Sequence, residues 1–171
     1  MIPIIRRIDD LGRIVIPKDI RKDLRIFKED LLKLEVKNDY IIISKNKETD
    51  EYIKLCNTIL NNLYKLLKNN IIITNNNIIL ECKGDIKNKG EKITDEIVNK
   101  ILNRKPEEKK ELLFITHNLS INKNYLFEPI IINSSVIGSI IYYKEDKITE
   151  NEKILIELSK SILENYIEEV Y

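Results

Sequence analysis

The chain has 171 residues, of which 43% are hydrophobic and 33% charged, and its formal net charge is +1. This length fits one large domain or two small ones, and no apolar stretch approaches the length of a membrane-spanning helix. Two distant cysteines and a single histidine make a structural zinc site improbable. These features predict a cytoplasmic protein with reduced thiols, no metal and no cofactor.

The charge is distributed unevenly along the chain. Residues 1–47 contain 12 Lys and Arg against 8 Asp and Glu, whereas the remaining residues contain 17 against 20. Five of the six arginines lie between residues 6 and 25. This asymmetry is typical of two modules, of which the first meets a polyanion.

The first module is predicted to have the order ββαββ. Gly12 supplies the permissive backbone for a turn between the first two strands, and Pro17 suits the first position of a helix over residues 17–24. Asn38 and Asp39 form the turn between the last two strands. The strands are expected at 4–8, 13–16, 31–37 and 40–44. A module of about 46 residues is hard to stabilise alone, so we expect it to dimerise.

The remaining residues predict an α+β domain that begins with a helix at the change of charge. Thr149, followed by Glu152 three residues later, forms a capping box for the last helix. The helices are expected at 46–70, at 94–103 and after Thr149. The strands are expected at 71–74, 77–82, 112–116, 125–132 and 136–144, with a charged break over 104–111. We therefore divide the chain into a first domain at 1–47, a linking helix at 48–70 that belongs to the second domain, and a sheet domain at 71–171.

Basic side chains gather on the short helix and on the strands that flank it. Those at i, i+3, i+4 and i+7 of the helix share one face and are Lys18, Arg21, Lys22 and Arg25. Arg6, Arg7 and Arg13 lie on the flanking strands, close to the Gly12 turn. A solvated basic face, balanced by neighbouring aspartates, is the alternative. The use of arginine favours nucleic acid, because a guanidinium grips phosphate or guanine bidentately.

The segment RRIDDLGRIVIPKDIRKDLRIFKEDLLKLEVKNDYIIISK, with LGRIVIP followed by IRKDL, closely resembles the DNA-binding domain of the AbrB family of bacterial transition-state regulators. The resemblance covers about residues 4–46 and implies a dimer of swapped hairpins. It also implies that the DNA-contacting arginines of the family correspond to Arg6, Arg13 and Arg21, with further basic positions at Arg7 and Lys22. Lys18 and Arg25 are added from the helix face. Neighbours in a strand point to opposite faces, so which of Arg6 and Arg7 meets DNA stays open.

Residues 71–171 resemble a GAF-like domain in element order, in EPIIINSSVIGSIIYYKED as a closing hairpin and in the capped last helix. The resemblance implies an antiparallel sheet with flanking helices that senses a ligand or assembles subunits. A pocket for a small molecule would be lined by Cys82, Gly84, Phe127 and Gly138, and a filled core without a ligand is the alternative. Apolar stripes at 50–68 and 150–168 predict an inter-subunit helical bundle, and therefore a tetramer of swapped dimers.

The sequence thus predicts a nucleoid-associated regulator of sporulation or transition-state genes that binds double-stranded DNA and no membrane. An antitoxin or other protein-binding module on the same N-terminal fold is the alternative, although its C-terminal part would then be a short disordered tail. An enzyme is not expected, because the chain shows no nucleophile–base pair, metal cluster or phosphate loop. His117 is interpreted as a surface residue and Cys82 as a small apolar side chain at a strand end.

Overall fold

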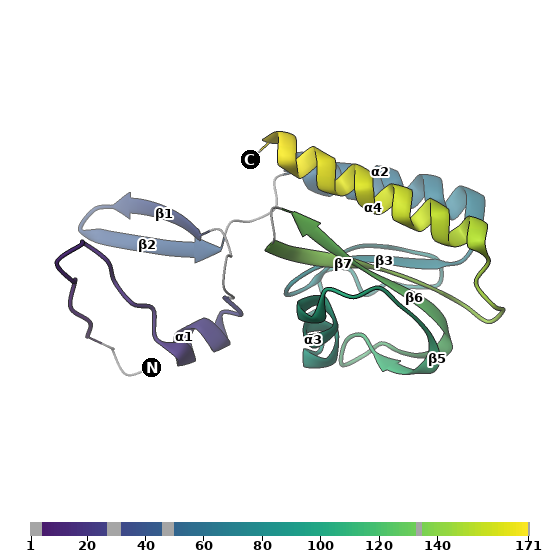
Figure 1. The fold of residues 1–171 in the computed structure, drawn as a ribbon, viewed down its shortest axis with the longest axis horizontal. Helices are drawn as coiled ribbons and strands as arrows, with labels where there is room; N and C mark the ends of the chain where they lie inside the picture. Colours follow the sequence, from purple (N-terminus) through teal and green to yellow (C-terminus); the bar gives the residue numbers. More distant parts are fainter. Residues whose placement is uncertain (1–4, 27–31, 46–49, 133–134, 171) are drawn as a thin grey trace. The chain divides into compact units, whose positions relative to one another are not determined.

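The computed structural model describes residues 5–26, 32–45, 50–132 and 135–170. The chain divides into two compact units, Met1–Asn46 and Lys47–Tyr171, and Figure 1 shows the elements of each. Residues 46–49, where the second helix was expected to begin, and residues 133–134, within the predicted closing hairpin, lie outside the described residues. No helix in the described part of the chain is both long and apolar enough to cross a bilayer.

The first unit contains the helix α1 (Lys18–Asp23) and the hairpin of β1 (Leu32–Lys37) and β2 (Tyr40–Lys45). The two strands are antiparallel, and their register places Leu34 opposite Ile43. Asn38 adopts φ 53° in the turn, a left-handed conformation that its short amide side chain tolerates. The predicted helix and hairpin are therefore confirmed. The helix is shorter than the predicted 17–24, however, because Pro17 is its N-cap and not its first helical residue, and Leu24 is its C-cap.

The two strands predicted at 4–8 and 13–16 are wrong for the single chain. Residues 5–8 and 13–16 belong to no ladder, and residue 4 lies outside the described residues. A strand persists only where another segment pairs its N–H and C=O groups. The turn over Asp9–Gly12 forms as predicted, with Gly12 at φ 75°. The apolar side chains beyond it stay in solvent, however, as the exposed fraction of 72% for Val15 shows.

The second unit is built on one antiparallel sheet with the strand order β4-β3-β7-β6-β5. Its strands are β3 (Asn70–Asn75), β4 (Ile79–Lys83), β5 (Glu107–Phe114), β6 (Ser120–Ile132) and β7 (Ser135–Lys144). Its helices are α2 (Asp50–Leu67), α3 (Asp95–Asn103) and α4 (Glu150–Val170). In Figure 1, α2 and α4 lie side by side on one face of the sheet and α3 lies on the other.

This three-layer arrangement explains why the β3 sequence is apolar without alternation. Ile71 and Ile73 belong to the core beneath α2 and α4, while Ile72 is fully buried outside that cluster. A strand covered on both faces reads as a continuous apolar run. Each such isoleucine contributes roughly 1.5–3 kcal/mol through its removal from water. The fold class is α+β, as predicted.

The strand β5 begins at Glu107, whereas the charged run had predicted a break up to residue 111. The charges are compensated by side chains that lie outside the charged run, on other elements. Lys100 Nζ lies 2.5 Å from Glu107 Oε2, and Tyr125 donates a 2.8 Å hydrogen bond from its hydroxyl to Glu111. Because these partners come from α3 and β6, a charged segment can form a stable edge strand, which local propensity does not reveal.

The start of α4 is fixed to the sheet by a single carboxylate. Glu152 accepts hydrogen bonds from the Thr149 backbone N–H (2.7 Å), the Tyr142 hydroxyl (2.5 Å) and Lys144 Nζ (2.8 Å). The Glu152 N–H donates back to Thr149 Oγ1 over 3.4 Å, which confirms the capping box. Burial alone would raise the pKa of Glu152, but the hydrogen bonds from Lys144, Thr149 and Tyr142 outweigh it and lower the pKa to about 2.

We expect Glu152→Gln to lower the free energy of unfolding at pH 7, by up to about 3 kcal/mol, because the pKa falls from 4.5 to about 2 on folding. A carboxyl with a depressed pKa stabilises the fold above its unfolded pKa and loses that effect as pH falls. The difference between the proteins should therefore shrink between pH 5 and pH 2 in urea melts.

Glu150→Gln is the matched control, because the Glu150 side chain is 81% exposed and forms a surface ion pair with Lys153, three residues along the same helix. Its effect should stay within about 0.5 kcal/mol. Equal effects of the two substitutions would contradict the assignment.

Candidate nucleic-acid interface

The predicted DNA-binding residues are distributed over a turn and a short helix. Arg6 and Arg7 precede the Asp9–Gly12 turn, and Arg13 follows it. The side chains on α1 are those of Lys18, Arg21 and Lys22, and all six of these basic residues are exposed. The structure therefore presents these six side chains to solvent within residues 6–22, on the two sides of the Asp9–Gly12 turn and on α1.

Arg25 departs from the predicted helical face. The helix α1 ends at Asp23 with Leu24 as its C-cap, and Arg25 adopts φ 50° in the left-handed region. The chain therefore leaves the helix before the i+7 position is reached, and the Arg25 side chain is half-buried. Its place on one face with Lys18 and Arg21 is thus wrong, because helical periodicity does not extend beyond the C-cap.

The turn itself is organised by Asp9, a residue that sequence reasoning missed. Gly12 donates a backbone hydrogen bond to the Asp9 carbonyl over 2.9 Å. The Asp9 carboxylate accepts hydrogen bonds from the backbone N–H groups of Leu11 and Arg13 and from the Arg13 side chain. The hydrogen bonds from the Arg13 backbone and side chain lower the pKa of Asp9. An Asp three residues before a Gly-Arg pair was the available signal.

Beside the turn, the first unit carries an open apolar groove of about 370 Å³. Eight apolar residues and Arg6 line it, and they are contributed by the segment around Pro17, by α1 and its C-terminal end, and by β2. Arg6 donates from Nη1 to the Ile5 carbonyl over 3.2 Å. A unit of this size has too few residues to bury the apolar lining of the groove by itself.

In the second unit, two of the four predicted pocket residues lie in one row across the sheet. Cys82 pairs with Ile72, Ile72 with Ile141, and Ile141 with Phe127. Phe127 is fully buried, and Cys82 is half-buried with its thiol 3.7 Å from the Ile86 carbonyl. Burial raises the pKa of the Cys82 thiol, which is consistent with an unreactive side chain.

The two glycines lie outside that row and allow close packing of the backbone. A Cβ on Gly138 would lie 1.9 Å from the Thr74 carbonyl oxygen, and one on Gly84 would lie 2.1 Å from Asn70 Oδ1. Gly138 is opposite Ile130, which belongs to the core beneath α2 and α4. The four residues therefore do not converge on one site.

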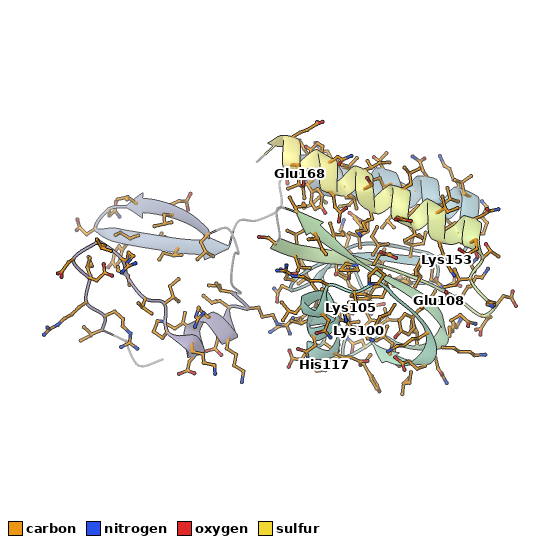
Figure 2. The ribbon with its side chains drawn as sticks, in the orientation of Figure 1. Lys100, Lys105, Glu108, His117, Lys153 and Glu168 are labelled. Atoms are coloured by element: carbon orange, nitrogen blue, oxygen red, sulfur yellow. The ribbon has the colours of Figure 1, made fainter. Side chains whose placement is uncertain are left out.

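Other chemistry-bearing side chains of the second unit are engaged in structure or lie at the surface. Figure 2 shows Lys100 beneath the sheet, where its ammonium also lies 5.6 Å from the centre of the Tyr125 ring. His117 is exposed between β5 and β6. Within the described ranges, no group of three or more His, Cys, Asp or Glu side chains is placed to hold a metal ion.

Two curated proteins are similar to this sequence. Stage V sporulation protein T of Bacillus subtilis is 28% identical over 153 residues, which cover 84% of each chain. The transition state regulatory protein AbrB of the same organism is 43% identical over 44 residues, which cover 26% of this chain and 46% of AbrB. No protein-family model matches the chain.

Solved structures of GAF domains share the fold of the second unit. The cyanobacteriochrome receptor PixJ superposes with a TM-score of 0.58 at 12% identity, covering 71% of this chain and 97% of that one. The GAF domain of CodY from Clostridium difficile gives 0.51 at 16% identity, with coverage of 64% and 82%. A GAF domain/HD domain protein from Geobacter sulfurreducens gives 0.50 at 14% identity, with coverage of 71% and 95%.

The N-terminal part is therefore similar in sequence to AbrB, and the second unit has the fold of GAF domains. The sheet order β4-β3-β7-β6-β5 with helices on both faces is the part that matches the GAF domains. The architecture predicted from LGRIVIP and from the closing hairpin is thereby confirmed.

We expect Phe127→Ala to lower the free energy of unfolding of the GAF-like domain by about 3–5 kcal/mol, as for other large-to-small changes in a packed core. The reason is that Phe127 is 0% exposed. If Phe127 instead lined an empty ligand pocket, its loss would have little effect. Phe114→Ala, at a site that is 50% exposed, is the matched control and should change stability by less than about 1 kcal/mol. Urea melts followed by circular dichroism measure both.

Proposed function

We propose that this chain is a transcriptional regulator that binds double-stranded DNA through the basic residues of its AbrB-type part. The observation that carries the proposal is the set of exposed basic side chains around the Asp9–Gly12 turn and on α1. The relatives support it, since AbrB is by name a transition state regulatory protein and the second relative is a sporulation protein. Such a regulator acts at the nucleoid, in the cytoplasm.

Dimerisation through residues 1–47 belongs to the same proposal. Among the described side chains between residues 5 and 45, none is buried. Apolar residues of both the turn segment and the hairpin lie in solvent, including Ile5 at 88% and Val36 at 82% exposure. A unit without a core cannot be stable alone, so a second copy that supplies strands to the groove accounts for both observations. In such a swapped-hairpin dimer, residues 5–8 and 13–16 gain the ladder partners that they lack in one chain.

The size of α1 limits how the dimer reads DNA. This helix has only six residues, which is too short to lie along a major groove as a recognition helix. A two-fold axis duplicates each basic cluster instead, so that two clusters meet successive grooves. We therefore assign most of the affinity to phosphate contacts and to DNA shape, with a small number of arginine–guanine contacts.

A second interface, through α4, would convert two such dimers into a tetramer. Ile154, Leu158 and Ile162 recur every four residues along α4 and are 59%, 56% and 44% exposed. Asn151, Ser161 and Asn165 share this outer face, and the exposed Glu150 and Glu169 lie at its two ends, so the stripe is uncharged only between them. An uncharged apolar stripe that faces away from its own core is typical of a helix that packs against another subunit.

In this proposal the main role of the GAF-like domain is subunit assembly, and binding of a small molecule is a subordinate role. The CodY domain is described as cofactor-binding, which motivates a ligand at the row of Cys82 and Phe127 in this sheet. Ile72, Phe127 and Ile141 are all fully buried on that row, however, so a ligand there would have to displace side chains. The antitoxin alternative is disfavoured, because residues 70–170 form a folded sheet domain rather than a disordered tail.

DNA binding should depend steeply on salt. If six to ten phosphates are neutralised per dimer, the logarithm of the binding constant should fall with the logarithm of salt concentration at a slope of roughly −5 to −9. Arg13→Ala should weaken binding to a random-sequence duplex and flatten this slope by about 2 per dimer, measured by fluorescence anisotropy. Arg104→Ala, at the one arginine of the second unit, is the control and should change neither. A salt slope near −2 for the wild-type protein, or unchanged DNA affinity of the Arg13→Ala variant, would contradict the proposal.

Leu158→Lys should reduce the full-length protein from tetramer to dimer, because a charge at the centre of the α4 stripe is costly to bury. Equilibrium sedimentation measures the mass. Leu112→Lys is the matched control, since Leu112 is 52% exposed on β5 and should leave the tetramer intact. A wild-type dimer would refute the second interface without affecting the first.

A further inference from the structure

The Asp9 carboxylate is shared between a backbone turn and one arginine side chain. Its Oδ1 accepts the N–H groups of Leu11 (3.0 Å) and Arg13 (2.8 Å), which fixes the turn. Its Oδ2 accepts Arg13 Nε–H over 2.8 Å. The Asp9 N–H in turn donates to the Arg13 carbonyl over 3.1 Å. Both ends of Arg13, the backbone and the guanidinium, are therefore held by the same residue.

The position of this ion pair decides which edge of the guanidinium stays available. A guanidinium can grip two acceptors side-on, through Nε and one Nη, or end-on, through both Nη groups. Asp9 occupies Nε, so the end-on edge remains. Among the described residues, no protein group accepts a hydrogen bond from either Arg13 Nη atom, and the Arg13 side chain is 70% exposed. The two Nη donors thus have no hydrogen-bond acceptor among the described residues and are open to solvent.

We propose that Asp9 is a positioning residue that holds the end-on edge of Arg13 ready for a guanine base and thereby contributes to sequence specificity. The inference rests on the proposed function. Guanine presents O6 and N7 as two neighbouring acceptors in the major groove, which match the two Nη donors. An arginine that is already oriented loses less rotamer freedom on binding, so its contact discriminates more strongly between bases.

Two simpler roles for Asp9 make different predictions. A residue that only builds the turn would act through Oδ1 and could be replaced by any side chain that accepts the same N–H groups. A residue that only balances charge would oppose DNA binding, because a carboxylate repels phosphate. Asp9→Asn separates the three, since it keeps the Oδ1 acceptor, removes the negative charge and leaves no acceptor for Arg13 Nε–H.

The experiment uses the full-length protein and a randomised duplex library. The duplex that the wild-type protein enriches is then remade with 7-deazaguanine, which lacks the N7 acceptor. Wild-type protein should lose about 10-fold in affinity for the modified duplex, in line with the value of a bidentate base contact. Asp9→Asn should bind the unmodified duplex about 10-fold more weakly and should no longer distinguish the two duplexes, while its affinity for random DNA stays equal or rises because a negative charge is lost.

Two further variants control for the loss of charge and for misfolding. Asp10→Asn removes the same charge from the neighbouring position and should leave discrimination intact. Asp9→Ser, which keeps a turn acceptor but not the second oxygen, should repeat the effect of Asp9→Asn and guards against misfolding of one variant. Unchanged discrimination in Asp9→Asn and Asp9→Ser would overturn the inference. If Arg13→Ala alone weakened binding in that case, the proposed function would stand, whereas no effect of Arg13→Ala on any duplex would defeat the proposed function itself.

Discussion

The structure depends on the inability of the first unit to bury its own apolar side chains. Residues 1–46 are too short to enclose a core, and each described side chain between residues 5 and 45 is exposed or half-buried. In the proposed dimer, a second copy supplies the ladder partners of the segments beside Gly12 and covers the groove. The basic residues lie on those same segments, so dimerisation would complete the fold and fix the geometry of the proposed DNA-binding surface in one event.

The second unit, in contrast, buries its apolar side chains within one chain. Its sheet is covered on both faces, and Glu152 fixes the start of α4 through hydrogen bonds from Thr149, Tyr142 and Lys144. A helix held that firmly presents its outer stripe, Ile154 to Ile162, as a fixed surface. The two units thus leave different apolar surfaces: one is required for folding, and the other is left over after folding is complete. If both proposed interfaces form, this difference makes the one at the first unit obligatory for folding and the one at α4 dispensable for it.

Local patterns predicted the elements whose causes are local. The alternation in β1, the Gly12 turn and the Thr149–Glu152 box depend on residues within a few positions of each other, and all three form. Residues 13–16 have strand propensity but pair with no other described segment, because pairing is a non-local event. Similarly, β5 starts early because Lys100 and Tyr125 compensate its charges, and neither partner is visible from the run itself. Arg25 was placed on a helix that ends two residues before it.

At the candidate site, the residue types could be predicted from the sequence, but the geometry of their side chains could not. Counting arginines predicts the class of partner, because guanidinium groups and phosphates attract each other wherever they lie. The count treats Asp9 as one unfavourable charge among several in the basic segment. The hydrogen bonds reverse that interpretation, since a carboxylate that fixes both the backbone and the Nε of Arg13 offsets its repulsion of phosphate by orienting a donor pair. The affinity for DNA can follow from the number of basic residues alone. Specificity for a base requires an oriented donor pair, and in the proposed contact the Asp9 carboxylate orients the guanidinium of Arg13.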